Sequence, residues 1–257
     1  MSDFCLTQRE GNLFIVTINR PEVMNSLHPP ANRALAAAFD EFHNSSDLWV
    51  AIVTGAGDRA FSAGNDLKHQ ATGGDMSGQP ASGFGGLTAR HDLVKPVIAA
   101  VNGVAMGGGF EIALACDLII ASENAIFALP EPRVGLAALA GGVHRLPRQI
   151  GLKQAMGMLL TGRRVPAAEG QRLGFVNEVV PAGQALAGAK KWAAQILECA
   201  PLSVRASKEA AMRGLGLPIE QAMAGRYDGI AAMAKSQDFI EGPLAFSQKR
   251  PPRWQGK

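Results

Sequence analysis

Cysteine and histidine are scarce in this chain of 257 residues, and the few that occur are scattered. Cys5, Cys116 and Cys199 form no CxxC pair, and no histidine lies near them in the sequence. An odd number of isolated thiols excludes a disulfide framework and a cysteine-based zinc site. The five histidines show no metal-ligand spacing either. We therefore expect no metal, and we interpret the thiols as those of a protein in the reducing cytoplasm.

The chain also lacks an excess of charge of one sign. It carries 25 Lys and Arg against 22 Asp and Glu, a formal net charge of +3. The last nine positions hold four of the basic residues, Lys249, Arg250, Arg253 and Lys257, so the rest of the chain is near neutral. A near-neutral body does not offer the basic face that nucleic acids require. We expect no nucleic-acid partner.

No targeting or membrane segment is expected. The first residues, MSDFCLTQREGN, contain no basic stretch followed by an apolar one, which a secretory signal needs. The run from Val97 to Cys116 has the length of a membrane span and only one charged residue. Its three consecutive glycines would each destabilise a lone helix by about 1 kcal/mol, and Glu111 would be costly in hydrocarbon. A buried strand, a glycine turn and a buried helix explain this run better.

Several motifs of cofactor-dependent and nucleophilic enzymes are absent as well. The chain has no GxxxxGK[ST] phosphate loop, no GxSxG nucleophile elbow and no HExxH zinc motif. Gly55-Ala56-Gly57 follows a strand-like run, but the third glycine and the helix of a dinucleotide-binding fingerprint are missing. We expect no cofactor.

What the sequence does contain is an α/β pattern. Hydrophobic residues make up 47% and charged residues 18%, enough for a full core. Residues 13–19 and 49–54 are short β-branched runs typical of strands, and apolar residues at helical spacing (35, 38, 39, 42) lie between them. A strand-helix-strand unit implies a parallel pair. The pattern recurs as strand 96–101, helix 109–116 and strand 117–121.

The pattern becomes mainly helical after about residue 142. One apolar stripe runs over 186–197 and another over 219–230, and a single further strand is expected at 175–180. Earlier in the chain, residues 62–92 form a long glycine-rich segment without periodicity. A loop of this length in a compact domain is typically a mobile lid or a binding loop.

Two strand-to-glycine junctions are the best candidates for a functional site. They are the segments 60–66 (AFSAGND) and 102–111 (NGVAMGGGFE), each at the carboxyl end of a predicted strand. Ligands of α/β sheets gather at these ends, and small residues let backbone N–H groups approach a ligand closely. Two such junctions could direct two N–H donors at one oxyanion. The glycines could instead serve only tight turns and close helix packing.

Two glutamates stand beside these junctions. Glu111 follows the glycines in the first helical turn among apolar neighbours, and Glu131 lies between two prolines in LPEP. A pair of carboxylates near an oxyanion hole could act as general base and acid. Each also has an ordinary explanation, a helix-dipole contact for Glu111 and an exposed loop position for Glu131. Asp117 begins a strand, where a structural or capping Asp is common.

Taken together, these segments resemble the crotonase family, the enoyl-CoA hydratases and isomerases, over essentially the whole chain. The matching blocks are INRPEVMNSL (18–27), AFSAGNDL (60–67), KPVIAAVNGVAMGGGFEIALACD (95–117), FALPEPRVGL (127–136) and EGPLAFSQKRPPRW (241–254). The resemblance implies an α/β fold, a crotonase-like spiral of ββα units, followed by a helical trimerisation region. It divides the chain into a core with the acyl-CoA site (1–195) and an oligomerisation region (196–257), in homotrimers or dimers of trimers.

The resemblance also implies the roles of individual residues. The N–H groups of Ala63 and Gly108 would form the oxyanion hole for the thioester carbonyl. Glu111 would activate the water that adds at the β-carbon, and Glu131 would deliver the proton to the α-carbon. Phe246 and Lys249 would reach the CoA of a neighbouring subunit in many members. The residues that match the substrate- and CoA-binding segments are Val23, Met24, Ala63, Gly64, Asn65, Asp66, Gly107, Gly108, Phe246 and Lys249.

The sequence departs from the commonest hydratase pattern at a few positions. Glu22 stands where many members have a Lys near the nucleotide, Asn65 is more polar than usual, and 136–142 (LAALAGG) lacks a proline often found there. The blocks GFGGLT, GGGFE, FALPE and EGPLAF are also similar to the carnitinyl-CoA dehydratase branch of the family.

These observations leave three functional hypotheses. The first is an enoyl-CoA hydratase without metal or redox cofactor. The presence of both acids favours it, because isomerases in the family commonly keep only one of them. The second is a carnitinyl-CoA dehydratase or an enoyl-CoA isomerase that uses the same site. The third is a non-catalytic acyl-CoA-binding or RNA-binding member, against which the intact glutamate pair and the near-neutral body argue.

Overall fold

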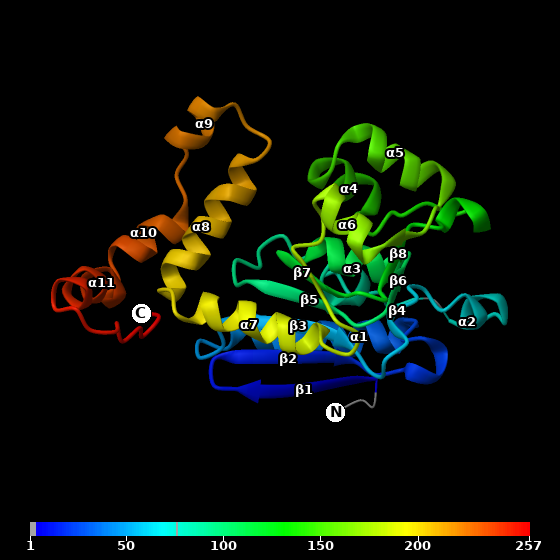
Figure 1. The fold of residues 1–257 in the computed structure, drawn as a ribbon, viewed down its shortest axis with the longest axis horizontal. Helices are drawn as coiled ribbons and strands as arrows, with labels where there is room; N and C mark the ends of the chain where they lie inside the picture. Colours follow the sequence, from blue (N-terminus) through cyan, green and yellow to red (C-terminus); the bar gives the residue numbers. More distant parts are fainter. Residues whose placement is uncertain (1–3, 76) are drawn as a thin grey trace.

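Two β-sheets form the centre of the computed structural model, which describes residues 4–75 and 77–257 (Figure 1). The larger sheet has the strand order β1-β2-β3-β5-β7-β10, and all neighbours except β1 and β2 are parallel. Its strands are β1 (Cys5–Glu10), β2 (Leu13–Ile18), β3 (Val50–Gly55), β5 (Val97–Val101), β7 (Leu118–Ser122) and β10 (Glu178–Val180).

A second, smaller sheet has the order β4-β6-β8-β9. Its strands are β4 (Ala60–Ser62), β6 (Val104–Met106), β8 (Ile126–Ala128) and β9 (Val165–Pro166). From β3 to β8 the chain visits the two sheets alternately, and each visit to the smaller sheet follows one to the larger sheet after a few residues. The winding is therefore the spiral of repeated units that the resemblance implies.

Helices cover both faces of the larger sheet, as its mostly apolar inner strands β2, β3, β5 and β7 require. Helix α7 (Ala185–Leu197) covers one face, where Val50, Ile52 and Ile98 pack against Ala189 and its neighbours. Helix α1 (Pro29–Asn44) covers the other face through a cluster that includes Phe39. Alternate residues of β3 belong to opposite clusters because side chains in a strand alternate between the two faces.

Helix α3 (Gly108–Ala115) packs against strands of both sheets and is buried almost throughout. Phe110, on this helix, packs against Phe127 and Phe175, and the centroids of the three rings lie 5.1–5.2 Å apart. The remaining helices of this body are α2 (Leu67–Ala71), α4 (Gly142–Gln149), α5 (Leu152–Thr161) and α6 (Ala167–Leu173). A packed aromatic centre under a glycine-rich helix start gives α3 a fixed position.

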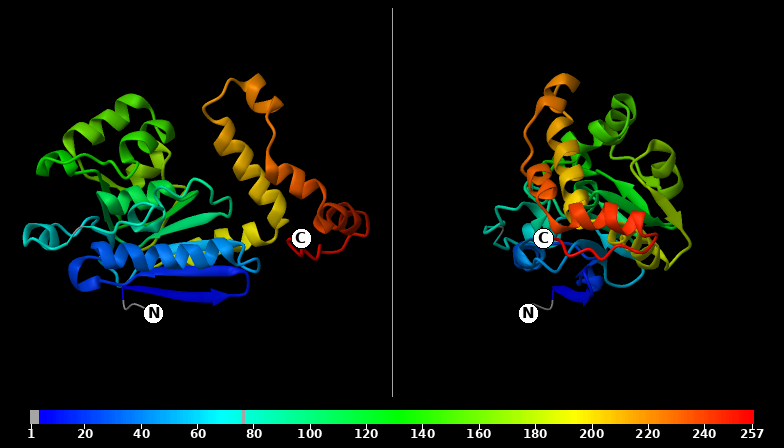
Figure 2. Two further views of the ribbon diagram at one scale, coloured as in Figure 1. Left: turned by 180° about the vertical axis from the view of Figure 1, so that it is seen from behind. Right: turned by 90° about the vertical axis from the view of Figure 1, so that its left-hand side faces the viewer.

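The C-terminal helices extend away from this body. They are α8 (Pro201–Gly214), α9 (Ile219–Ala224), α10 (Asp228–Ala234) and α11 (Gln237–Ser247). Figure 2 shows from two further directions that they form a separate arm, with α11 at its far end. The arm exposes large apolar side chains, among them Met223 (81% exposed) and Phe246 (88% exposed).

The structure confirms most of the predicted elements and corrects two. The apolar stripe expected over 219–230 is not one helix, because Gly225 and Tyr227 separate α9 from α10 in extended conformations. The strand expected at 175–180 begins only at Glu178, since Phe175 turns into the aromatic cluster. The run 97–116 is strand, short strand and helix, and none of the described helices is long and apolar enough to cross a membrane. The domain boundary proposed at 195/196 falls inside α7.

Candidate active site

The first junction follows β4 and is held by a neighbouring loop. Leu27 pairs with this segment, donating its N–H to Gly64 O (2.7 Å) and accepting from Asp66 N–H (3.0 Å). Asp66 forms an ion pair with Arg20 (2.9 Å), both side chains being about nine-tenths buried. The Arg20 guanidinium and the backbone N–H of His69 hold the pKa of the Asp66 carboxyl below its usual range, although burial opposes them. The loop is therefore fixed on both of its flanks.

The second junction joins β6 to α3 and touches the first. Gly107 has φ +53°, donates its N–H to Ala128 O (2.9 Å) and precedes the first residue of the helix. A Cβ on Gly64, which has φ +85°, would lie 2.8 Å from the nitrogen of Gly108. The two junctions meet so closely that only glycine fits between them. The structure thus brings together the two segments that the sequence singled out.

Of the two backbone N–H groups expected to form the oxyanion hole, those of Ala63 and Gly108, only one is free. The N–H of Ala63 donates to Met24 O (2.9 Å), so it is already engaged and does not match the predicted oxyanion donor. Two residues further on, the N–H of Asn65 has no partner among the described residues, and neither has that of Gly108 at the start of α3. The two hydrogen bonds of Leu27 engage Gly64 O and Asp66 N–H, on either side of residue 65, and neither uses the N–H of Asn65.

Glu111 lies in the first turn of α3 and is 3% exposed. Its Oε1 accepts a hydrogen bond from the N–H of Gly142 at the start of α4 (2.8 Å). Burial, together with a smaller effect of the nearby Glu131 carboxyl, raises the pKa of Glu111 to about 7, although the N–H of Gly142 acts in the opposite direction. A carboxyl group that titrates near neutral pH can both take up and release a proton under working conditions.

Glu131 begins a short 3₁₀ helix, Glu131–Val134, directly after Pro130. Its Oε2 is buried and has no hydrogen-bond partner among the described residues. A Cβ on Gly107 would lie 3.0 Å from its Oε1, so the carboxyl group packs against the glycine of the second junction. Burial raises its pKa. The two glutamates thus flank the glycines from the sides of α4 and β8.

This arrangement brings together two hydrogen-bond donors and two carboxyl groups, which an acid-base site for acyl compounds needs. Two free N–H groups can stabilise a developing oxyanion, each worth about 3 kcal/mol when the donor is preorganised. Two carboxyl groups with raised pKa values interact electrostatically and stand next to these donors. No group of His, Cys, Asp and Glu in the described part of the chain could hold a metal ion.

The other predicted contact residues fall into two groups. Met24, next to Val23, has φ +58° and lines a cavity of about 700 Å³ together with Met106, Pro130 and three arginines. This cavity opens on the Glu131 side of the site. Phe246 and Lys249, in contrast, lie on and after α11, and α11 and α2 are at opposite ends of the molecule in Figure 1. The structure does not bring them to the site of their own chain.

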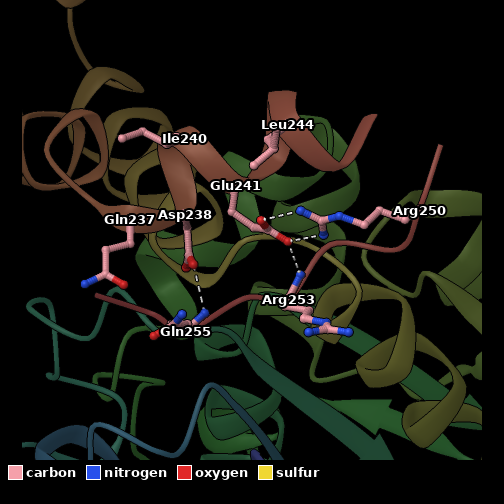
Figure 3. Close-up of a pocket in the computed structure, with 8 residues that line it drawn as sticks. All are labelled: Gln237, Asp238, Ile240, Glu241, Leu244, Arg250, Arg253 and Gln255. Carbon is pink, nitrogen blue, oxygen red and sulfur yellow. Dashed lines mark hydrogen bonds and ion pairs between the residues drawn. The ribbon is translucent and has the colours of Figure 1, made fainter. Parts of the chain in front are cut away.

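The tail beyond α11 folds back onto that helix. Glu241 binds the guanidinium of Arg250 with both oxygens (2.6 and 2.9 Å) and accepts the N–H of Arg253 (2.7 Å), as Figure 3 shows. These contacts lower the pKa of Glu241 to about 2. Asp238 accepts the N–H groups of Gln255 and Gly256 (2.8 Å each). The tail is therefore part of the folded arm.

Sequence reasoning missed several residues that shape the site. Asn25 is fully buried at φ +54°, and its amide donates to Ala60 O (2.7 Å) and Ala56 O (3.0 Å), which holds the loop that receives Ala63. Phe84 packs its ring on Gly108, where a Cβ would lie 2.4 Å from a ring carbon. No periodicity marks such residues, since they belong to irregular segments.

Asp117 has the structural role that its position suggested. Its Oδ2 accepts the N–H of Val97 (2.8 Å) and the ammonium of Lys208 (2.7 Å), so it joins β5, the start of β7 and helix α8. Neither of these contacts involves a residue of the glycine junctions.

Comparisons with known proteins place the chain in a family. The sequence profile of the enoyl-CoA hydratase/isomerase family matches residues 8–257. The chain is 43% identical to the carnitinyl-CoA dehydratase of Salmonella arizonae over 262 residues, and the match covers 100% of both chains. A carnitinyl-CoA dehydratase of Salmonella enteritidis is 41% identical over 262 residues, again over 100% of both.

Solved structures agree with this placement. The enoyl-CoA hydratase of Mycobacterium tuberculosis superposes with a TM-score of 0.94 at 37% identity, over 100% of both chains. The carnitinyl-CoA hydratase of Mycobacterium avium gives a TM-score of 0.80 at 39% identity, also over 100% of both. The expected crotonase fold, two sheets followed by C-terminal helices, is confirmed. The chain therefore belongs to the enoyl-CoA hydratase/isomerase family, the crotonases, and is a hydro-lyase of that family.

Proposed function

We propose that the protein is an enoyl-CoA hydratase, which adds water reversibly to a 2-trans-enoyl-CoA to give a 3-hydroxyacyl-CoA. The observation that carries the proposal is the pair of carboxyl groups, the buried one of Glu111 and the half-buried one of Glu131, on either side of the free N–H groups of Asn65 and Gly108. Family members named for hydration or dehydration, similar over their whole length, support this reaction class.

In the proposed reaction the N–H groups of Asn65 and Gly108 bind the thioester oxygen and stabilise the enolate. This pair replaces the one predicted from the sequence, since Ala63 is occupied by Met24. The ionised carboxylate of Glu111 takes a proton from water while the hydroxyl group bonds to the β-carbon. Protonated Glu131 then gives its proton to the α-carbon of the enolate. The raised pKa of each glutamate favours a state with one proton on the pair near neutral pH.

Dehydration of carnitinyl-CoA is the second candidate, because curated relatives at 41–43% identity carry that name. It would use the same atoms in the reverse direction. Isomerisation of an enoyl-CoA needs proton transfer without addition of water, so product analysis separates it from hydration.

The experiment follows enoyl-thioester absorbance, which falls when crotonyl-CoA or a longer enoyl-CoA is hydrated and rises when carnitinyl-CoA is dehydrated. We expect Glu111→Gln and Glu131→Gln each to reduce turnover at least about a hundredfold, the usual contribution of a general acid or base. Glu123→Gln, a change of an exposed glutamate at the end of β7, is the matched control. Near-native turnover of either site variant would contradict the assignment.

We further propose that the chain acts as a homotrimer or a dimer of trimers in which 196–257 contacts a neighbour. The apolar side chains exposed on α8–α11, Phe246 above all, support this assembly because isolated chains seldom leave so many uncovered. In such an assembly Phe246 and Lys249 would serve the CoA site of another subunit. Light scattering coupled to size-exclusion chromatography measures the state, and a stable monomer at micromolar concentration would contradict it.

A further inference from the structure

A second cavity, of about 740 Å³, opens on the Glu111 side of the site. Phe84, whose ring lies on Gly108, forms part of its wall. Ala140 and Gly141 form another part and directly precede Gly142, whose N–H binds Glu111. The cavity is thus adjacent both to the proposed oxyanion donor and to the proposed base. A group bonded to the reacting carbons would extend into it.

The lining of this cavity is apolar near the site and basic further out. Phe84 and Leu139 supply apolar surface, and the titratable lining residues are His91, His144, Arg145 and Arg148. None of the described residues that line it is Asp or Glu. The basic side chains come from the segment after Phe84 and from α4, and helix α8 contributes only uncharged residues.

The two arginines are not neutralised by carboxylates. Arg148 donates to His144 O (2.7 Å), and Arg145 donates to Thr88 O (2.8 Å) and Ala140 O (3.5 Å). Neither forms an ion pair within the described ranges 4–75 and 77–257, and Glu111, at longer range, is the one carboxylate there that acts on Arg145. Six other arginines in this part of the chain do have such partners, namely Arg9, Arg20, Arg90, Arg163, Arg213 and Arg250.

From this cavity we propose that the enoyl group of the substrate ends in a carboxylate, which the basic side chains of α4 receive. The inference rests on the proposed hydratase function and specifies its substrate class. Arg148 lies six residues beyond Gly142 on α4, about 9 Å along the helix axis at 1.5 Å per residue. A chain of about six to eight carbons spans that length. A quaternary ammonium group would meet positive charge there with no acidic partner.

The phosphates of CoA are a second anion that these arginines could bind, and the experiment separates the two sources. It compares kcat/KM for three 2-enoyl-CoA thioesters of equal chain length. One is neutral, one ends in a carboxylate and one ends in trimethylammonium. We expect the carboxylate substrate to exceed the ammonium substrate at least about tenfold, the factor that 1.4 kcal/mol gives, and to exceed the neutral one as well.

The double variant His144→Gln/Arg148→Gln tests where the preference arises. Both side chains are exposed, so the fold does not depend on them. We expect the variant to lose the preference for the carboxylate while turnover of the neutral thioester stays unchanged within about twofold. Arg172→Gln removes an exposed positive charge on α6 and should leave the preference intact.

Each outcome decides between the hypotheses. An equal loss for all three thioesters in the double variant would show that the arginines bind CoA phosphates, and would overturn the proposal. Turnover of the ammonium substrate at or above the level of the other two would also overturn it. Absence of turnover with every thioester would refute the hydratase function itself, and the substrate class with it.

Discussion

Glu111 should reduce the stability of the protein above neutral pH, and replacing it with Gln should remove that penalty. Its pKa is about 7 in the folded protein against an ordinary value of 4.5. The unfolded chain releases this proton near pH 4.5, whereas the folded protein keeps it to about pH 7. The folded state therefore binds more protons in between, and stability falls as the pH rises through this window.

The magnitude follows from these two pKa values. At about 1.4 kcal/mol per pH unit, the difference corresponds to about 3 kcal/mol of unfolding free energy. The amide oxygen of Gln can still accept the N–H of Gly142, so the contact to α4 remains. Any constant cost of burying the amide group is the same at every pH. The predicted quantity is thus the change, between pH 4.5 and pH 8, in the stability difference between variant and wild type.

Thermal unfolding at fixed protein concentration over pH 4.5–8.5 measures this change. For a chain of this size, about 3 kcal/mol corresponds to a relative gain of about 6–12 °C for Glu111→Gln at pH 8. Glu220→Gln, which makes the same change in an exposed position on α9, is the matched control. A stability difference between Glu111→Gln and wild type that is constant over the range would refute the argument that burial sets this pKa.

Three further changes test other contacts of the site and the arm. Gly107→Ala should lower turnover by more than about tenfold, because its Cβ would lie 3.0 Å from Glu131 Oε1 at φ +53°; unchanged kinetics would show that the carboxyl group has room to move. Asn25→Ala should lower the unfolding free energy by about 2–4 kcal/mol, since the buried Ala60 O and the half-buried Ala56 O lose the amide donor of Asn25; denaturant titration measures this, and a loss below about 1 kcal/mol would contradict it. Asp238→Asn should leave only one strong acceptor for the two tail N–H groups, so limited proteolysis should remove 251–257 faster with no change in the core; an equal cleavage rate would argue against the anchoring role.

The sequence predicted the strands of the larger sheet other than β1, and the site segments, because both depend on local patterns. Strands such as β3 and β5 are continuous apolar runs, and their burial in the structure follows from helices on both faces. The glycine junctions and both glutamates were also visible as short motifs. Their convergence follows from the alternation of the chain between two sheets, which places the ends of β4 and β6 next to each other.

The smaller sheet could not be predicted in the same way. Its strands are two or three residues long, too short for an alternation of side chains to appear. The choice between the N–H groups of Ala63 and Asn65 was equally hidden, because it depends on the direction in which Met24 O points. Nothing in the sequence pattern of 136–149 indicates that its basic side chains line a cavity with Phe84.

Phe246 lies on α11, in the C-terminal arm, whereas Glu111 lies on α3 in the body of the molecule. If the arm completes the site of a neighbouring subunit, a chain whose glutamates are inactive still supplies an intact arm to that subunit. Mixing a Glu111→Gln chain with a chain altered at Phe246 would then create some sites that are intact in every part. Two inactive proteins would restore activity in each other, and specific activity would fall on dilution as the assembly dissociates.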